Sequence, residues 1–432
     1  MLLNPVVLAV ITLCVLCLCK VNVLLSMLVA LFVGGLFGGL GLEGTMSSLL
    51  VGLGGNGETA LAYILLGTFA SCMAYTGITD ILSKKISKVV GTNKILLIAI
   101  LTLIACASQN IIPVHIAYIP ILIPPLLVIM NKMKLDRRGV ACAIAFGHKA
   151  PYIAIPMGFG LIFQGIIKTN MTQNGMPVTI GEIASVNWIL AVSMFIGLLI
   201  AVFITYRKPR EYKDVELTIS HEGENLKLNS AHYKTLIAII VVVLIQIRYK
   251  SLPLAALGGL LVIFLSGAVK KKDIDEQFSE GVKLMGFIAV VMLVAGGFAQ
   301  VLKDTGAVEE LVDHSIALMG GSKLIAATVI TLIGLLVTMG IGTSFGTVPV
   351  LAVLYVPLCA KLGFSPAATI VLMSAAAALG DAGSPASDTT LGPTSGLNAD
   401  GQHDHIWDTC VPTFLHFNIP LMVGAILAAQ VL

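Results

Sequence analysis

The richest polar interruption of a hydrophobic run in this sequence is Gly380-Asp381-Ala382-Gly383-Ser384-Pro385-Ala386-Ser387-Asp388-Thr389-Thr390, within the apolar residues 366–395. Irregular backbone at membrane depth is tolerated only where protein or a cavity surrounds it. A charged side chain costs about 3 kcal/mol at the centre of a bilayer, so two carboxylates there imply a use. The stretch predicts a broken helix that lines a binding site; the alternative is a polar turn at the membrane surface.

The composition around this stretch is that of a membrane protein. Of 432 residues, 57% are hydrophobic and 11% are charged, whereas soluble domains average about 25% charged residues. The mean hydropathy is +0.97, so lipid must be the solvent. A net charge of +3, without a basic patch, argues against nucleic acid as a partner. Residues 1–19 have no positively charged start and no cleavage site, which favours a retained helix.

Apolar runs along the chain predict the membrane segments. A crossing needs about 20 residues, so the runs 95–130 and 324–360 are too long for one helix and predict hairpins or broken pairs. The expected fold is an all-α integral membrane protein with about 12–14 membrane segments. The runs cover residues 2–19, 21–42, 59–82, 95–130, 139–165, 187–206, 235–248, 251–269, 286–302, 324–360, 366–395 and 411–432.

The basic residues predict the orientation of these segments. If the polar segment 207–234 is cytoplasmic, then Lys20 and residues 83–94, 131–138 and 270–285 lie on the same side. That side then holds 19 of the 26 lysines and arginines, the bias expected of cytoplasmic loops. Both termini are then expected outside, in a multi-pass protein of the bacterial inner membrane.

An internal repeat links the two halves at an offset of 229 residues. Between residues 67 and 122, 14 of 56 ungapped positions are identical to their counterparts, among them Gly67 with Gly296. The predicted topology places the two copies with opposite orientation, which is the arrangement that alternating access uses. We therefore expect a first repeat at 1–206, a cytoplasmic linker at 207–234 and a second repeat at 235–432; an old duplication without mechanical meaning is the alternative.

Polar interruptions at matching places in both halves define a candidate site. Unwound carbonyls can coordinate Na+, and helix N-termini can hold anionic groups. Hydroxyls and carboxylates near Asp381 and Asp388 suit Na+, and a carboxylate also suits a proton. The candidate substrate- or ion-binding residues are Asp381, Ser384, Ser387, Asp388, Thr389, Thr390, Thr343, Ser344, Thr347, Asn110, His115, His148 and Lys149.

Lys149 is the one basic residue that the topology places inside the membrane. It could replace a second sodium ion, neutralise Asp381 or Asp388, or bind a substrate carboxylate; a cation that extends to the interface is the alternative. His148 and His115 could relay protons or serve as structural hydrogen-bond partners.

Two further clusters have a simpler explanation than a metal site. Cys14, Cys17 and Cys19 are expected to be small apolar fillers on a lipid-facing helix. The run Asp400–Asp408 matches no zinc-ligand spacing, and we expect a cytoplasmic loop whose His405 and Asp408 pack against the broken helix.

These motifs resemble the bacterial Na+/H+ antiporter family of NhaC type. Gly380–Thr390 is similar to the signature of that family, and Gly342–Thr347 is similar to its second glycine- and hydroxyl-rich motif. The resemblance implies inverted repeats with hairpins and broken helices, and transport coupled to Na+ or H+. Ala382 stands where that family has lysine, and residues 55–58 and 392–408 resemble a branch assigned to amino-acid uptake.

The sequence thus predicts a cation-coupled secondary transporter of a small solute, with an amino acid favoured. Na+/H+ antiport and organic-acid transport are the alternatives, and a homo-oligomer is compatible with the sequence. Inverted repeats argue against a channel. The absence of HExxH, GxSxG and Walker motifs argues against an enzyme, and no cofactor is expected beyond the coupling ion.

Overall fold

The computed structural model describes residues 4–19, 21–110, 116, 118–157, 159–213, 228–249, 251–307, 310 and 322–432. In these ranges every regular element is a helix and no β-strand occurs, which confirms the all-α prediction. A helix satisfies its own backbone hydrogen bonds, and it is therefore the element that a chain this apolar can place in lipid.

The helices of the first half precede the polar segment 207–234. They are α1 (Pro5–Leu18), α2 (Val23–Phe37), α3 (Gly41–Leu53), η1 (Gly54–Asn56), α4 (Gly57–Thr76), α5 (Ile78–Val90), α6 (Lys94–Asn110), α7 (Ile119–Lys132), α8 (Arg137–Ala154), α9 (Phe159–Gln173), α10 (Ile180–Ile200) and η2 (Ala201–Thr205).

The helices of the second half follow that segment. They are α11 (Ser230–Tyr249), α12 (Leu252–Leu265), η3 (Lys271–Asp273), α13 (Ile274–Asp304), α15 (Lys323–Ile341), α16 (Ser344–Lys361), α17 (Pro366–Ala378), α18 (Asp388–Leu397), η4 (His405–Cys410), α19 (Val411–Thr413), η5 (Phe414–Asn418) and α20 (Ile419–Val431).

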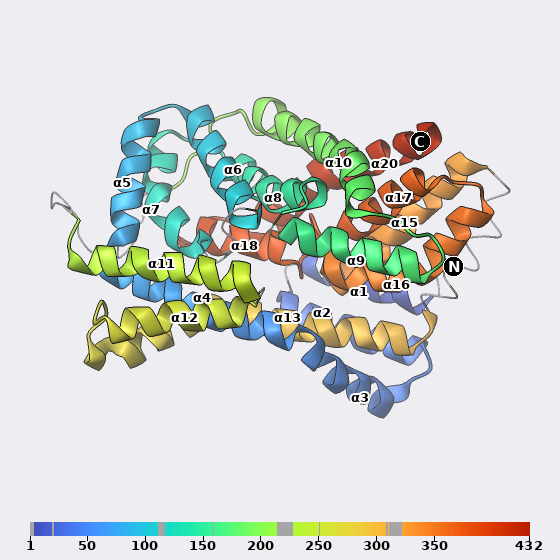
Figure 1. The fold of residues 1–432 in the computed structure, drawn as a ribbon, viewed down its shortest axis with the longest axis horizontal. Helices are drawn as coiled ribbons and strands as arrows, with labels where there is room; N and C mark the ends of the chain where they lie inside the picture. Colours follow the sequence, from blue (N-terminus) through green and yellow to red (C-terminus); the bar gives the residue numbers. More distant parts are fainter. Residues whose placement is uncertain are drawn as a thin grey trace.

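These helices pack in two groups that each mix both halves of the sequence. In the first group α13 packs along α2, α3 and α4, and α12 packs against α4 and α11. In the second group α8 packs between α6 and α10, while α17 contacts α15, α16 and α20 (Figure 1). Helix α1 contacts both α2 and α15, so it lies between the two groups.

Helices α8 and α17 form the centre of the second group. Every residue of α17 from Ala368 to Ala378 is buried, and so is almost every residue of α8 from Gly139 to Ile153. A helix that is apolar on all sides is a buried helix, and alanine-rich α17 fits that pattern. Polar side chains on these two helices are therefore surrounded by protein.

Small residues bring helices of the first group into close contact. A Cβ atom on Gly67 would lie 2.5 Å from the carbonyl oxygen of Gly281, and one on Gly281 would lie 2.3 Å from the Cα of Thr68. Without a hydrophobic driving force between helices in lipid, such close backbone packing supplies much of the association energy. Glycine is required on α4 and α13 for this reason.

The structure divides the long apolar runs much as the sequence predicts. Residues 95–130 contain α6 and α7, and residues 324–360 contain α15 and α16. The run 366–395 is interrupted between Ala378 and Asp388. Helices α8 and α9 are related by a bend of 49°, so both halves contain a broken helix.

Residues 83–94, which the sequence predicts on the cytoplasmic side, include the end of α5, because this helix continues to Val90. Ile78, Ile81 and Ile86 are buried, whereas Lys85 and Lys88 are exposed. This spacing gives an amphipathic helix. The lysines that indicate the cytoplasmic side lie on its solvated face.

The prediction of a loop over Asp400–Asp408 was wrong at its end, because His405–Asp408 begin η4. Asp404 caps this helix: its side chain accepts hydrogen bonds from the backbone N–H groups of Ile406 at 3.0 Å and Trp407 at 2.8 Å. A carboxylate at a helix N-terminus satisfies otherwise unpaired donors, which explains why the helix starts in a polar sequence.

Among the described residues, four helices are long and apolar enough to cross a membrane alone, and six if each bent pair counts as one span. Shorter apolar helices lie among them, such as Lys94–Asn110 and Pro366–Ala378. The total of 12–14 segments, the inverted relation of the halves and the boundaries at 206 and 235 stay predictions. Segments predicted on one side do meet: Lys94 and Arg210 both donate to the carbonyl of Lys134, at 3.4 and 3.1 Å.

Candidate solute-binding site

The backbone between α17 and α18 is unwound and wholly buried from Leu379 to Ser387. Gly380 has φ +84°, and a Cβ there would lie 2.7 Å from the carbonyl oxygen of Leu335. Both the left-handed conformation and the close packing require glycine. Helix α17 therefore ends at this residue, and the chain turns before Ser387 caps α18.

Asp381 projects from this unwound stretch into a ring of donors. Its carboxylate accepts hydrogen bonds from the backbone N–H of Ser344 at 3.2 Å and from the Ser344 hydroxyl at 2.6 Å. The hydroxyl of Ser387 donates to its other oxygen. Lys149, on α8, forms an ion pair with it. Asp381 is 2% exposed, so protein groups and not solvent compensate its charge.

Lys149 reaches Asp381 from the first half of the chain and is 1% exposed. Its Nζ donates to the hydroxyl of Tyr152 at 2.5 Å and to the Ser344 hydroxyl at 2.8 Å. The Tyr152 hydroxyl also donates to Ser344 Oγ at 2.9 Å. The ion pair therefore lies at the centre of a network that joins α8, α16 and the stretch between α17 and α18.

Two helix N-termini favour the negative charge of Asp381. Ser344 is the first residue of α16, and Ser387 is the N-cap of α18. The positive end of a helix dipole stabilises an anion by about 0.3–1 kcal/mol, and by more when the site is buried. A buried ion pair still has a large desolvation cost. Its position in the apolar centre of the chain thus indicates a functional requirement.

Asp388 points in a different direction from Asp381. Its carboxylate accepts a hydrogen bond from the hydroxyl of Tyr63, on α4, at 3.1 Å, and from Thr389 Oγ1 at 3.3 Å. Tyr63 is 1% exposed, whereas Asp388 is half-buried. Because α4 belongs to the first helix group and α18 packs against α8 of the second, this contact joins the two groups.

Several of the predicted hydroxyls bind backbone and not the carboxylates. Ser384 Oγ donates to the carbonyl of Met339 at 3.1 Å, and Thr390 Oγ1 donates to that of Ser384 at 2.6 Å. Thr347 Oγ1 donates to the carbonyl of Thr343, the N-cap of α16, at 2.8 Å. These bonds hold the unwound segment and the start of α16 in place.

The candidate residues of the first half other than Lys149 also contact groups outside the Lys149–Asp381 pair. His148 Nε2 lies 3.1 Å from the hydroxyl of Tyr118, on the side of α7, so it faces away from Lys149. Asn110 donates to the carbonyls of Ile155 at 3.1 Å and Met157 at 2.9 Å, just beyond α8. His115 lies outside the described residues.

Tyr152 and Tyr63 belong to the site although sequence reasoning missed them. Tyr152 follows Lys149 by three residues, which places both on one face of α8, so helical spacing alone could have identified it. Tyr63 is 325 residues from Asp388, and no local pattern connects the two.

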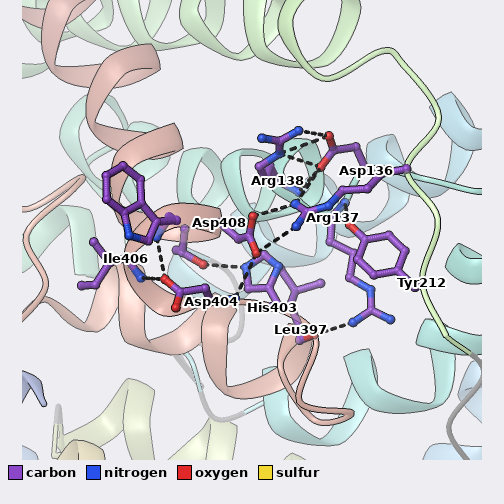
Figure 2. Close-up of polar contacts among 12 residues, drawn as sticks. Asp136, Arg137, Arg138, Tyr212, Leu397, His403, Asp404, Ile406 and Asp408 are labelled. Atoms are coloured by element: carbon purple, nitrogen blue, oxygen red, sulfur yellow. Dashed lines mark hydrogen bonds and ion pairs between the residues drawn. The ribbon is translucent and has the colours of Figure 1, made fainter. Parts of the chain in front are cut away.

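A second polar cluster joins the N-terminus of α8 to the segment after α18. Arg137 is fully buried and binds Asp400 with both terminal nitrogens, at 2.7 and 2.5 Å. Arg210 binds Asp408 at 2.6 Å, and Arg138 binds Asp136 at 2.6 Å. Figure 2 shows Asp136, Arg137, Arg138 and Asp408 of this cluster near His403. His405, in contrast, lies 2.9 Å from the carbonyl of Pro385 in the broken helix, as predicted.

Electrostatics favours the charged form of this cluster. Burial raises the pKa of Asp400, but hydrogen bonds and charge from Arg137 outweigh it, so the pKa lies below the ordinary value. Burial lowers the pKa of His403 to about 3, so its ring is neutral near pH 7. The cluster is a fixed set of ion pairs at neutral pH.

An all-helical, multi-pass membrane chain with broken helices and a buried ion pair is typical of a secondary transporter. The model of a protein family described as "Na+/H+ antiporter family" matches residues 143–428. A second family model, described as "Na+-H+ antiporter family", matches residues 4–90. The chain belongs to the Na+/H+ antiporter family. It is a membrane transporter and not an enzyme.

Relatives of full length match the whole chain. An uncharacterized membrane protein of Vibrio parahaemolyticus is 47% identical over 99% of this chain and 100% of its own. A Bacillus subtilis protein named as a candidate amino acid transporter is 45% identical over the same shares. A Vibrio cholerae protein named as a candidate anaerobic C4-dicarboxylate transporter is 26% identical over 83% of this chain and 80% of its own.

A solved structure also matches most of the chain. The YdaH transporter of Alcanivorax borkumensis is 14% identical, with a TM-score of 0.48, over 91% of this chain and 89% of its own.

Proposed function

We propose that the protein is a cation-coupled secondary transporter of a small zwitterionic solute, with amino acids as the solute class. The observation that carries this proposal is the buried pair of Lys149 and Asp381 with its surrounding hydroxyls. The Bacillus subtilis relative, named as a candidate amino acid transporter, supports the solute class.

The pair is chemically complementary to an amino acid. A solute carboxylate can take the place of Asp381 on the ammonium of Lys149, where the hydroxyls of Tyr152 and Ser344 lie within hydrogen-bond distance. The solute ammonium can then bind the carboxylate that Lys149 releases. Exchanging one ion pair for two leaves no charge unpaired, so it avoids the desolvation cost of an isolated buried ion.

Alternating access requires that occupancy of this site changes the packing between parts of the protein. The hydrogen bond between Tyr63 and Asp388 joins the two helix groups next to the broken helix. A coupling cation near Asp388 would compete with that bond and thereby link ion binding to movement of one group against the other. One Na+ that moves down 100 mV provides about 2.3 kcal/mol, enough for a solute gradient of roughly fifty-fold.

Uptake into proteoliposomes tests the proposal. The purified protein is reconstituted and screened with radiolabelled amino acids in Na+ or choline medium, each at two values of external pH. We expect accumulation of at least one amino acid that depends on a Na+ or H+ gradient. Asp388→Asn should abolish the coupling, and full coupled activity in that variant would remove Asp388 from the ion site.

Na+/H+ antiport is the second candidate, and the two carboxylates of the broken helix, Asp381 and Asp388, favour it, since a carboxylate can bind either Na+ or a proton. Exchange of Na+ for H+ in liposomes that contain no organic solute would support antiport and refute uptake. Organic-acid transport is the third outcome, named for the Vibrio cholerae relative; uptake of a dicarboxylate without any amino acid would favour it.

A further inference from the structure

Three buried amide side chains surround the C-terminal end of α8. Gln164, on α9, and Asn187, on α10, donate to the same acceptor, the carbonyl oxygen of Ile153, at 2.9 and 3.1 Å. Asn110, at the end of α6, donates to the carbonyl of Pro151 in the last turn of α8 and to those of Ile155 and Met157 just beyond it. Gln164 and Asn187 are fully buried, and Asn110 is 5% exposed.

The orientation of these amides is fixed by their partners. A backbone carbonyl only accepts hydrogen bonds, so each amide must present its NH2 group to the end of α8. The amide oxygens of Asn110, Gln164 and Asn187 are then left buried, and in the part of the chain that the structure describes they have no hydrogen-bond partner. An unsatisfied buried acceptor costs about 1–3 kcal/mol, and three around one helix end imply a missing donor or cation.

We propose that these three oxygens form a binding site for a monovalent metal cation, Na+, at the break between α8 and α9. The last carbonyls of α8 carry the negative end of its dipole, which favours a cation. Amide and carbonyl oxygens are hard ligands that suit Na+, and an uncharged set holds a monovalent ion better than it holds a divalent ion that needs carboxylates.

The position of this amide site suits a coupling role. Ile153 is the neighbour of Tyr152, whose hydroxyl contacts Lys149, so the break lies next to the proposed solute site. Its role in coupling rests on the proposed function, whereas binding of the ion does not. Two other occupants would satisfy the same oxygens: a water molecule, or the ammonium group of the solute.

The experiment separates the acceptor of Gln164 from its donor. Gln164→Lys keeps a donor for the carbonyl of Ile153, removes the acceptor and places a positive charge where the ion would bind. Gln164→Leu removes both groups. Gln246→Leu is the matched control, because Gln246 is also buried with an unpaired amide oxygen but lies on α11, which packs against α12 and α4 in the other helix group.

Thermal unfolding of the purified full chain is followed as choline is replaced by Na+ at constant ionic strength, without solute. We expect the wild type and Gln246→Leu to be stabilised by Na+ with the same midpoint concentration. Gln164→Leu should raise that midpoint at least tenfold, and Gln164→Lys should show no response to Na+. An unchanged midpoint in both Gln164 variants would overturn the site and leave water as the occupant.

Further measurements distinguish a failure of the proposed ion site from a failure of the proposed function. No stabilisation of the wild type by Na+ alone would overturn the proposal. Stabilisation by amino acids in choline that is lost in Gln164→Leu would then assign the oxygens to a solute ammonium. Na+ stabilisation that depends on Gln164, in a protein that takes up no amino acid, would refute the proposed function and support the ion site. Full Na+ response in Asn187→Leu would also count against the site.

Discussion

Helix α8 carries two buried cations, and their ion pairs differ in kind. At its start, Arg137 holds Asp400 with two parallel hydrogen bonds, and its terminal nitrogens also donate to the carbonyl of Leu397 and the side chain of Asn131. Three turns further on, Lys149 meets Asp381 among hydroxyl groups. Both pairs join the first half of the chain to the second.

The chemical difference between the two cations determines which ion pair can exchange partners. The planar guanidinium of arginine fixes a bidentate geometry, whereas the ammonium of lysine is a compact charge with rotatable donors. Hydroxyls can reorient to donate or accept, so a ligand can replace one partner of Lys149 at little cost. We infer that the Arg137–Asp400 pair holds the fold and that the Lys149–Asp381 pair binds the solute.

Removing the carboxylate of each pair should give the largest contrast. Asp381→Asn should lower uptake at least about 100-fold, because losing one partner of a buried charge pair costs about 2–5 kcal/mol of binding. Asp400→Asn should lower the thermal stability but leave uptake per folded protein within about threefold. Uptake and folded fraction are measured in the same proteoliposomes. The opposite pattern would reverse the roles of the two pairs.

Replacing each cation by the other residue type, Arg137→Lys and Lys149→Arg, tests the difference between the two ion pairs. Arg137→Lys loses the bidentate geometry and the contacts to Leu397 and Asn131, so we expect a loss of about 2–3 kcal/mol in stability. Lys149→Arg keeps the charge but is too large for its surroundings, so transport should fall while the chain stays folded. Circular dichroism melts and uptake rates give both readouts. Equal effects of the two exchanges on stability would contradict the distinction.

Removing one hydroxyl should have a smaller effect. Tyr152→Phe keeps the ring packed against Phe163 and Phe345 but removes a hydrogen bond to Lys149 worth about 1 kcal/mol. The KM for the solute should rise about fivefold with little change in melting temperature. Tyr355→Phe is the control, since that hydroxyl binds a backbone carbonyl on α15. A similar rise in KM for both variants would make the effect nonspecific.

The smallest expected effect is a dependence of stability on pH. Because the folded-state pKa of Asp400 lies below the ordinary value of 3.8, its contribution is fully present above that value and is lost as pH falls through the folded pKa. The melting temperature should therefore fall as the pH drops below about 4, and Asp400→Asn should show a shallower fall. Parallel curves for wild type and variant would show that Asp400 is not responsible.

The sequence predicted which residues form the site better than it predicted where their side chains point. Asp381, Ser344 and Lys149 lie together because glycines and a proline unwind a stretch that the composition forces into the protein interior. The spacing of seven between Asp381 and Asp388 does not bring the carboxylates together, since the segment is not helical. His148 points away from its neighbour Lys149 because successive helical residues lie about 100° apart.

Contacts between distant segments were beyond sequence reasoning. The Tyr63–Asp388 hydrogen bond and the Arg137–Asp400 pair join residues 325 and 263 positions apart. Sequence reasoning did not separate α5 from the apolar run 59–82, although Ile78, Ile81 and Ile86 follow the helical period. Charge marks a solvated face as readily as a loop.

The most direct test of the central claim is equilibrium binding of the transported solute to the double variant Lys149→Met/Asp381→Asn. Without either charge the site has no unpaired buried ion, so the protein should fold with a melting temperature near that of the wild type. Our account predicts that this folded protein binds no solute at concentrations 100 times the wild-type Kd. Binding with the wild-type Kd would contradict it.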